Sequence, residues 1–528
     1  MRSRKTLFDV WNWLIGLCAP LVLVMCVLAW LFAGAQPDHG NRVAAQDLRP
    51  SPAASSSTLA SLYLPWLGKE ADLAPPHRLK FGFQFAMEDF PEQHADDLRL
   101  ELPRGRELGL RSVRARLFWD HVEPVNTSPA DFDWSATDER FAAYTAWGYD
   151  LMVQLIAFPE WATVYPCGYD LLPGMEAEWR QFVRAAVERY GEANRVVAWE
   201  IGNEPDGRSH VIESDWDRPE GWGRGEPKGP YGGCWAGRAD RYVHFLSLAY
   251  DEIKAVDPEA IVTYGGLAYT DHEGDFDKGF LADFMAAGGG AYFDVINYHW
   301  FPNVTSHNPG RKHHREQLAI IASHGVTGRP VWLTETTRLT QRGKPESEAW
   351  QIEYLTRQLP EMLTFSEIER VYFYGWTDFP DDVSDGFGTY QRGFVRNDHQ
   401  PKVALPLIPK LIEAVRGRPE RLDVGTGVTA WRFRAPRATQ DTVIAWPADA
   451  ATGGATGPGS GGGGAEGDVA THARFPVPTG RTLEVERFTE EAIMSGECCP
   501  VERPVSERGR VYVELRGEPA VWVRMGRR

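Results

Sequence analysis

Two glutamates each end a short apolar run of the sequence. Glu204 lies near the end of the segment Ala198–Asp206, directly after Asn203, and Glu335 follows the run Val331–Thr334. A pair of carboxyl groups can cleave a glycosidic bond, because one protonates the leaving oxygen while the other attacks the anomeric carbon. The first must be protonated near the working pH and the second must be ionised. The sequence supplies the pair, and the fold must supply the distance between them.

The elements that would position this pair are eight short apolar runs between about residues 78 and 415. Continuous apolar runs are typical of parallel strands that are buried on both faces. Helix-like segments lie between them, such as Glu176–Tyr190, whose apolar residues recur at i, i+3, i+4 and i+7. Eight strand–helix units predict an α/β fold, a (β/α)8 TIM barrel, whereas the alternative, a doubly wound open sheet, would not need eight. The runs are Leu79–Ala86, Val113–Trp119, Tyr149–Ile156, Val196–Gly202, Ile261–Gly266, Phe293–His299, Pro330–Glu335 and Arg370–Trp376.

In such a barrel the carboxyl ends of all strands meet at one face, where active sites lie. Glu204 follows the fourth run and Glu335 ends the seventh, so we expect both carboxyl groups over one pocket. A salt bridge in a loop is the plainer interpretation of each. Glu200, on the same side of its strand as Glu204, could face the barrel interior, and we expect no catalytic role for it.

The segment Trp199–Pro205 resembles the strand-four signature of clan A, a large group of retaining glycoside hydrolases. The resemblance implies Glu204 as the acid/base, Glu335 as the nucleophile and Asn203 as a donor to the sugar 2-hydroxyl. With the segment Asp294–Trp300 and a trailing β domain, the chain is most similar to family 39. That family includes β-xylosidases and bacterial hydrolases tied to exopolysaccharide production. The implied mechanism requires no metal and no cofactor.

The resemblance also indicates residues around the pair. His299 ends the sixth run, where the clan places a histidine near the nucleophile or a substrate hydroxyl; a satisfied rim histidine is the alternative. Relatives often carry a tyrosine two positions later that holds the nucleophile, but this chain has Phe301 there. Any such hydrogen bond to Glu335 must therefore come from elsewhere. The candidates are Tyr264, Tyr298 and Tyr374.

Three further residues are predicted to bind substrate. An arginine beside the nucleophile would keep its carboxylate ionised, and we favour Arg116 over Arg114 for that place. Trp119 ends the second run, and Trp376 ends the eighth. The resemblance implies that Trp376 stacks on the sugar at the cleavage point, and plain core packing is the alternative interpretation.

Two motifs of the sequence suggest bound groups, and we expect neither to be real. His313 and His314 are adjacent, but neighbouring histidines rarely ligate one ion, so a solvated loop is expected. The segment Gly459–Gly464 matches a dinucleotide fingerprint, but no strand–turn–helix pattern surrounds it. We therefore predict no cofactor and no metal site.

The first 35 residues carry a membrane signal. Three basic residues precede an uncharged apolar run from about Leu14 to Ala35, which is long enough to span a bilayer as a helix. The positive flank should stay cytoplasmic, so the rest of the chain would be exported. The run is longer than a usual signal core, which favours an uncleaved signal-anchor; Ala33–Ala35 resembles a cleavage site, and cleavage would give a secreted protein. Residues 36–77 are expected to be a linker.

After the barrel at 78–418, residues 419–528 predict a small antiparallel β domain, sandwich-like, with a Gly-rich loop at 452–467. Cys167 and Cys234 fall in expected loops and could form a disulfide, while the adjacent Cys498 and Cys499 have no evident role. No CxxC spacing is present, which argues against a cysteine zinc site.

Composition narrows the partners. The chain has 528 residues with 43% hydrophobic and 24% charged residues, values typical of globular proteins. Its net charge of −17 argues against nucleic acid as a main partner. We expect a carbohydrate substrate, a membrane contact through the N-terminal helix and, from the resemblance, a polysaccharide synthesis or export machinery as a candidate partner. The alternatives are a non-catalytic glycan-binding or assembly protein, or an inverting or transglycosylating enzyme, on the same scaffold.

Overall fold

The computed structural model describes most of the chain beyond residue 78. The described residues are 79–85, 88, 91–163, 170–191, 194–207, 235, 238–271, 276–302, 309–380, 390–434, 440–448, 471–476, 483–488, 499–504, 510–515 and 520–526. The predicted membrane anchor, the linker, the Gly-rich loop and Cys167, Cys234 and Cys498 lie outside them. Within these ranges, no helix has the length and apolar character to cross a bilayer.

Eight parallel strands form the barrel predicted from the apolar runs. They pair in the order β5-β4-β3-β2-β1-β9-β7-β6. A parallel bridge between Leu267 and Tyr298 joins the segment after β5 to β6, which closes the ring. The strands are β1 (Lys80–Gln84), β2 (Ser112–Phe118), β3 (Asp150–Ile156), β4 (Val196–Ile201), β5 (Val262–Tyr264), β6 (Ile296–Trp300), β7 (Val331–Thr336) and β9 (Ile368–Tyr374).

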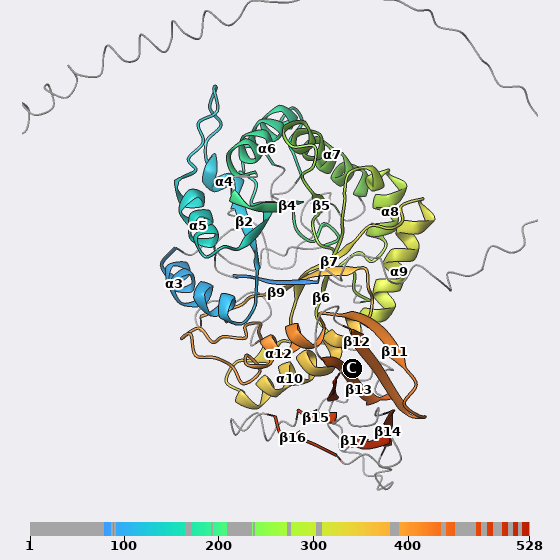
Figure 1. Ribbon diagram of the computed structural model, residues 1–528. Coiled ribbons are helices and arrows are strands. Elements are labelled where there is room, and N and C mark those ends of the chain that lie inside the picture. The colour runs from blue at the N-terminus through green and yellow to red at the C-terminus, as the bar shows by residue number, and fades with distance from the viewer. Residues whose placement is uncertain are drawn as a thin grey trace, which may run out of the picture. The chain divides into compact units, whose positions relative to one another are not determined.

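Helices surround the strands as an outer ring (Figure 1). The predicted amphipathic segment forms α6 (Glu176–Tyr190), and its apolar stripe, which includes Trp179, Phe182 and Val183, is buried. The other helices of the described barrel are α3 (Pro91–Glu107), α4 (Trp119–Val122), α5 (Ser135–Ala146), α7 (Ala239–Val256), α8 (Phe280–Ala286), α9 (Gly310–Ser323), α10 (Trp350–Glu353), α11 (Leu359–Met362) and α12 (Leu407–Ala414), with short turns η3 (Gly289–Ala291), η4 (Pro345–Ala349) and η5 (Tyr354–Gln358).

The adjacent histidines lie in α9, so the prediction of a solvated loop is wrong. His313 and His314 are almost completely buried on the stripe of α9 that also contains Ile321. His314 pairs through Nδ1 with the Tyr298 hydroxyl at 2.8 Å and through Nε2 with Glu367 at 2.9 Å. The helical spacing of these histidines relative to Ile321 places them on the inner face of the helix.

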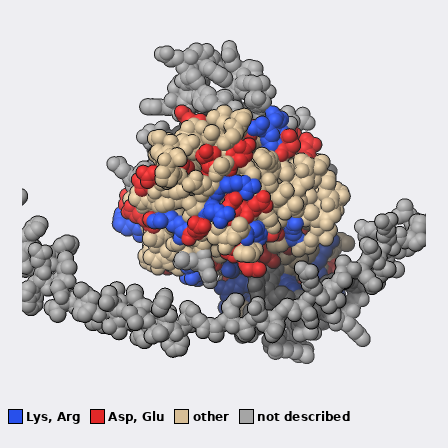
Figure 2. Space-filling view, turned by 90° about the horizontal axis from the view of Figure 1, so that it is seen from above, with Lys and Arg blue, Asp and Glu red and all other residues tan. Residues whose placement is uncertain are grey.

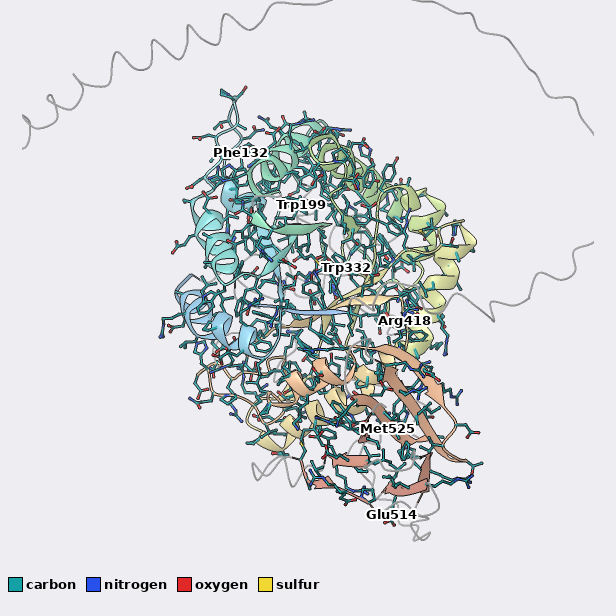
Figure 3. The ribbon with its side chains drawn as sticks, viewed as in Figure 1. Phe132, Trp199, Trp332, Arg418, Glu514 and Met525 are labelled. Carbon is teal, nitrogen blue, oxygen red and sulfur yellow. The ribbon has the colours of Figure 1, made fainter. Side chains whose placement is uncertain are left out.

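The interior of the barrel changes character along its axis. One layer is largely apolar and contains Met152, Ala198, Val295, Trp332 and Tyr372. Figure 3 shows Trp332 among the strands near the middle of the ring. The next layer toward the carboxyl ends of the strands is polar, with buried Gln84, Arg114, Gln154, Glu200 and Asn297. This polar layer forms the floor under the strand ends.

The residues beyond the barrel form antiparallel sheets, as predicted. A six-stranded sheet has the order β11-β12-β13-β18-β15-β16, and β14 pairs with β17. The strands are β11 (Arg418–Leu422), β12 (Val428–Arg434), β13 (Gln440–Pro447), β14 (Thr471–Pro476), β15 (Leu483–Arg487), β16 (Val501–Glu502), β17 (Arg510–Leu515) and β18 (Val521–Gly526), and a separate hairpin-like pair joins β8 (Thr340–Gln341) to β10 (Tyr390–Gln391).

Two polar contacts tie these sheets to the barrel helices: Trp522 Nε1 donates to the carbonyl oxygen of Thr356 at 2.9 Å, and Lys410 of α12 pairs with Glu486 of β15. Cys499 is buried and disulfide-bonded.

The face of the molecule seen in Figure 2 carries basic and acidic side chains interspersed.

Candidate active site

Glu204 leaves the end of β4 in an unusual backbone conformation. Its φ of +38° lies in the left-handed region, which side chains other than glycine rarely adopt. The Glu204 amide donates to the carbonyl oxygen of Gly266 at 3.1 Å, which anchors this turn to the segment after β5. The side chain is 17% exposed. Glu204 therefore extends from a fixed turn with part of its side chain open to solvent, and strained backbone of this kind clusters at functional sites.

Glu335 is aimed by an irregularity in β7. Leu333 lies opposite Tyr298 on β6, but the next pair joins Glu335 to His299, so Thr334 is an extra residue in β7. A bulge of this kind redirects the side chains that follow it. Glu335 is 5% exposed and reaches the same end of the barrel as Glu204.

His299 joins the two carboxylates. Its Nδ1 atom lies 2.8 Å from Oε1 of Glu204 and 3.5 Å from Oε2 of Glu335. One oxygen of each glutamate and this ring nitrogen all lie within 4.8 Å of one another. Burial of the ring lowers the pKa of His299, but the charges of Glu335 and Glu204 outweigh it, so the pKa lies above its ordinary value. The structure thus brings Glu204, Glu335 and His299 together as predicted.

The position of His299 depends on Gly266. The ring lies directly against this glycine, and a Cβ atom there would overlap with Nε2 of His299 and lie 2.8 Å from Oγ1 of Thr334. No hydrogen-bond partner of Nε2 is found among the described residues. The proton of a neutral ring is therefore assigned to Nδ1, where it faces Glu204.

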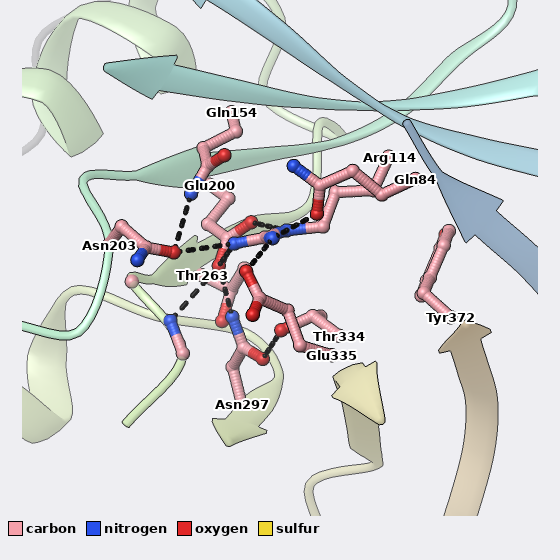
Figure 4. A network of polar contacts seen from close by, with 12 residues as sticks. Gln84, Arg114, Gln154, Glu200, Asn203, Thr263, Asn297, Thr334, Glu335 and Tyr372 are labelled. Atoms are coloured by element: carbon pink, nitrogen blue, oxygen red, sulfur yellow. Dashed lines mark hydrogen bonds and ion pairs between the residues drawn. The ribbon is translucent and has the colours of Figure 1, made fainter. Parts of the chain in front are cut away.

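The arginine beside Glu335 is Arg114, not Arg116 as predicted. Nη1 of Arg114 lies 2.5 Å from Oε1 of Glu335, and its guanidinium also contacts Glu200 (Figure 4). Arg116 lies one alternation further along β2, where its backbone amide donates to Glu88 at 2.8 Å. Both arginines are on the same face of the strand, because they are two residues apart. Their depth along the barrel axis therefore decides which of them contacts Glu335. Substrate binding by Arg116 stays a prediction.

Asn203 is oriented by two donors. Its Oδ1 atom accepts hydrogen bonds from Nη2 of Arg114 and from Nε2 of Gln154, both at 2.9 Å. The amide nitrogen must then point away from these two groups, since the two ends of the side-chain amide are opposed. Asn203 is half-buried, and this orientation offers an N–H donor at the mouth, as the predicted contact with a sugar hydroxyl requires.

The two tryptophans that were predicted to contact substrate are both buried in the structure. Trp119 is fully buried among the outer helices, where its ring stacks on Phe182 at 5.2 Å. Trp376 is also fully buried, and its Nε1 donates to Glu101 of α3 at 3.0 Å. Both tryptophans come after the last strand residue whose side chain points into the barrel. Their own side chains turn away from the barrel interior and pack in the hydrophobic core between the strands and the helices.

Tyr374, the last residue of β9, takes the place expected of Trp376. It has the inward parity of Tyr372, is half-buried, and meets the ring of Phe301 edge-on at 6.2 Å. The other tyrosines considered for Glu335 are engaged elsewhere: the Tyr298 hydroxyl pairs with His314, and that of Tyr264 accepts the Asn297 amide at 3.1 Å. Among the described residues, Tyr374 and Phe301 thus form an aromatic pair beyond the end of β9.

Several functional neighbours were missed in the sequence. Gln84, Gln154 and Asn297 lie in the interior of β1, β3 and β6 and contact Arg114, Asn203 and Glu200 respectively. The sequence does indicate these residues, because each is a polar residue within an apolar run. A buried polar side chain pointing into the barrel needs a hydrogen-bond partner there.

Asp206 is a second buried acid next to the turn. Its carboxylate accepts the amides of Ala268 at 3.2 Å and Tyr269 at 2.9 Å. Burial and the neighbouring charge of Glu204 raise the pKa of Asp206 to about 7, against the opposing effect of these hydrogen bonds. Asp206 thereby ties the segment after β5 to the turn that carries Glu204.

The three central groups are close enough to share a cation, since their ligand atoms lie within 4.8 Å of one another. The guanidinium of Arg114 contacts Glu335 directly and would repel a metal ion at that carboxylate. The donor set therefore suits proton transfer better than metal binding.

Part of the barrel sequence matches a known protein family. Residues 239–393 match the family described as glycosyl hydrolase catalytic core, a range that includes His299 and Glu335 but not Glu204. No curated protein matches the chain in sequence.

Solved structures share the fold over most of the chain. A family 39 glycoside hydrolase from Bacteroides cellulosilyticus WH2 has a TM-score of 0.56 at 16% identity, covering 85% of this chain and 81% of its own. A family 39 β-xylosidase from Caulobacter crescentus has a TM-score of 0.54 at 16% identity, covering 85% and 96%. A glucosidase from Croceicoccus marinus has a TM-score of 0.50 at 15% identity, covering 81% and 91%.

The catalytic-core match over residues 239–393 and the barrel fold together support a glycoside hydrolase. Among solved structures its fold is like that of family 39 enzymes, so the resemblance predicted from the sequence is confirmed.

Proposed function

We propose that the protein is a retaining β-glycosidase that acts by double displacement on an oligosaccharide or polysaccharide. Glu335 is the nucleophile and Glu204 the acid/base. The observation that carries the proposal is the proximity of the two carboxylates, because one oxygen of each lies within 4.8 Å of the other and of a ring nitrogen of His299. Retaining enzymes hold the two carboxyl groups about 5–5.5 Å apart, whereas inverting enzymes need roughly 6.5–9.5 Å to admit a water molecule.

In the first step Glu335 attacks the anomeric carbon. The bond from that carbon to the leaving oxygen breaks, and the proton of Glu204 passes to the leaving oxygen. The guanidinium of Arg114 beside Glu335 favours the ionised nucleophile. The hydrogen bond from His299 occupies Oε1 of Glu204, so Oε2 is the oxygen that carries the transferred proton.

In the second step Glu204, now ionised, takes a proton from a water molecule, whose oxygen attacks the anomeric carbon and releases Glu335. Two inversions at one carbon retain its configuration. The amide of Asn203 donates to the sugar 2-hydroxyl, and Tyr374 with Phe301 offers the apolar surface on which a sugar face can rest.

The substrate class is a β-linked neutral sugar. The structural neighbours include a β-xylosidase and a glucosidase, and xylose and glucose are both uncharged sugars. The buried carboxylates of Glu335 and Glu200 beneath the pocket would disfavour a sugar with its own negative charge at the cleavage point.

We also propose that the enzyme acts outside the cytoplasm, anchored by its N-terminal segment. The uncharged run between about Leu14 and Ala35 supports this, as does the disulfide at Cys499, since disulfides persist in oxidising compartments. Fusion of residues 1–77 to a reporter that is active only after export would test it. An inactive fusion that stays in the cytoplasm would contradict the proposal.

The test of the activity is hydrolysis of a panel of aryl β-glycosides, including xylosides and glucosides, by the wild type and by Glu335→Gln. We expect release of the aryl group by the wild type only, and proton NMR should show the β-anomer first. An α-anomer would indicate inversion. If both proteins were inert on the panel and on natural β-glycans, a glycan-binding function would replace the proposal.

A further inference from the structure

Glu200 is a buried carboxylate that the double displacement does not use. Its side chain is 0% exposed, and it lies on β4 below the turn that carries Glu204. We propose that Glu200 is a positioning residue that acts through Arg114 and sets the positive charge experienced by Glu335. The proposal rests on the proposed function, in which Glu335 is the nucleophile.

Glu200 forms a bidentate ion pair with Arg114. Oε2 of Glu200 accepts from Nε of Arg114 at 2.6 Å, and Oε1 accepts from Nη2 at 3.0 Å (Figure 4). A bidentate pair of this kind fixes the plane of the guanidinium as well as its position. Nη1 is thereby left to reach Glu335, and Nη2 also reaches Asn203.

The carboxylate of Glu200 is itself held in place. Its Oε1 atom also accepts the amide of Gly266 at 2.9 Å and Nδ2 of Asn297 at 2.8 Å. Oδ1 of Asn297 in turn accepts the hydroxyl of Thr334 at 2.5 Å, next to Glu335 in β7. Glu200, on β4, therefore connects β2, β6 and the segment that follows β5 through one network of hydrogen bonds beneath the site.

One buried cation serves two buried carboxylates. The side chains of Arg114 and Glu200 are 0% exposed and that of Glu335 is 7% exposed, so solvent screens their charges weakly. The ionised trio carries a net charge of −1. If Glu200 were neutral, the full charge of Arg114 would act on Glu335. Arg114 would then hold the carboxylate of Glu335 more tightly, and a carboxylate held more tightly by a cation is a weaker nucleophile.

Gln84 offers a way to move the counter-charge. Its Oε1 atom accepts from Nη1 of Arg114, the same nitrogen that contacts Glu335. Its Nε2 atom is buried, and no acceptor for it is found among the described residues. Gln84→Glu would therefore keep the hydrogen bond from Nη1 of Arg114 and remove the unsatisfied donor. It would also add a negative charge at Nη1, whereas Glu200 lies at Nε and Nη2.

The experiment is the pH profile of kcat/KM for an aryl β-glycoside cleaved by the wild type. Its acid limb reports ionisation of the nucleophile. We expect Glu200→Gln to move this limb to lower pH by about one unit and to lower kcat. Gln84→Glu should move the limb to higher pH, and the double variant should return it close to that of the wild type.

Glu101→Gln is the matched control, because Glu101 is equally buried but pairs with Trp376 and Arg104 in the outer ring. It should leave both limbs unchanged. The number of competent sites is counted by the burst of aryl alcohol from an activated 2-deoxy-2-fluoro glycoside. A merely structural role of Glu200 would lower this number without moving the limb, and that result would overturn the proposal.

If Glu200→Gln does not fold, Gln84→Glu alone decides, since an unmoved acid limb in that variant would show that this guanidinium does not relay charge to Glu335. Failure of the proposed function is separate, because the wild type itself would then give neither turnover nor a burst.

Discussion

Nδ1 of His299 lies 2.8 Å from Oε1 of Glu204. The ring is fully buried and is held against Gly266, so this hydrogen bond fixes the direction of the Glu204 carboxyl group. Because Nδ1 is also 3.5 Å from Glu335, one imidazole responds to the charge of both carboxylates. In relatives a tyrosine often holds the nucleophile; in this chain Phe301 cannot, and His299 and Arg114 are the groups that contact Glu335 among the described residues.

Stability should depend on pH through His299. Burial opposes protonation, but the two glutamates raise the pKa of His299 above its ordinary value of about 6.5. Its stabilising contribution is then fully present below that pH and is lost as pH rises through the higher pKa of the folded protein. We expect Tm of His299→Gln to fall further below that of the wild type at pH 5.5 than at pH 9, which lie about one unit below and about two and a half units above the reference pKa. Calorimetry measures Tm of both proteins at each pH. A difference in Tm that increases with pH would contradict a raised pKa of His299 in the folded protein.

Gly266 should tolerate no side chain. A Cβ atom would overlap with His299 and approach Thr334 to 2.8 Å, so the ring must shift. A displacement of about 1 Å can cost roughly 100-fold in rate, and we expect a loss of kcat of about that size in Gly266→Ala. Gly279→Ala is the control, because its Cβ would meet only the Asp277 side chain at 3.3 Å. Equal kcat in the two variants would show that the ring position does not matter.

Glu204→Ala should lose the acid/base but not the nucleophile. General acid–base catalysis contributes about 10²–10⁴-fold, so turnover of unactivated glycosides should fall by that factor. A dinitrophenyl glycoside, which needs no protonation, should still react with Glu335. Added azide should then restore turnover and give a β-glycosyl azide, identified by NMR. An α-azide would assign the nucleophilic role to Glu204 instead.

Much of the barrel follows from the sequence. Each of the eight apolar runs contains or overlaps one strand, because parallel strands covered by helices must be apolar on both faces. Glu204 and Glu335 were predictable because a charged residue at the end of such a run lies where the strands open to solvent. The bulge at Thr334, which aims Glu335 at His299, leaves no signal in the sequence.

The errors have a common cause. Arg114 and Arg116 share one face of β2, and only the depth of each in the barrel decides which meets Glu335. Trp119 and Trp376 lie just past strand ends, where the chain is free to turn either way, and both turn outward into the helical shell. Periodicity predicts a face within an element, but it does not predict direction after the element ends.

Trp376 should therefore matter for stability and not for substrate. Trp376→Phe removes the hydrogen bond to Glu101 and leaves a cavity, so the free energy of unfolding should fall by about 1–3 kcal/mol. KM should stay within a factor of about two, since the ring does not reach the mouth. Tyr374→Ala should instead raise KM by about fivefold through the loss of a stacking surface. Denaturant unfolding and steady-state kinetics measure these effects, and the opposite pattern would restore Trp376 as the sugar platform.

The central claim is that Glu335 forms a covalent bond to the sugar. Incubation of the wild type with activated 2-deoxy-2-fluoro β-xyloside and β-glucoside should trap this intermediate, and peptide mass spectrometry should find one sugar on the peptide that contains Glu335. Glu204→Gln should still be labelled there, and Glu335→Gln should not. A wild type that turns over glycosides with the label on another residue, or a Glu335→Gln variant that remains fully active, would contradict the account.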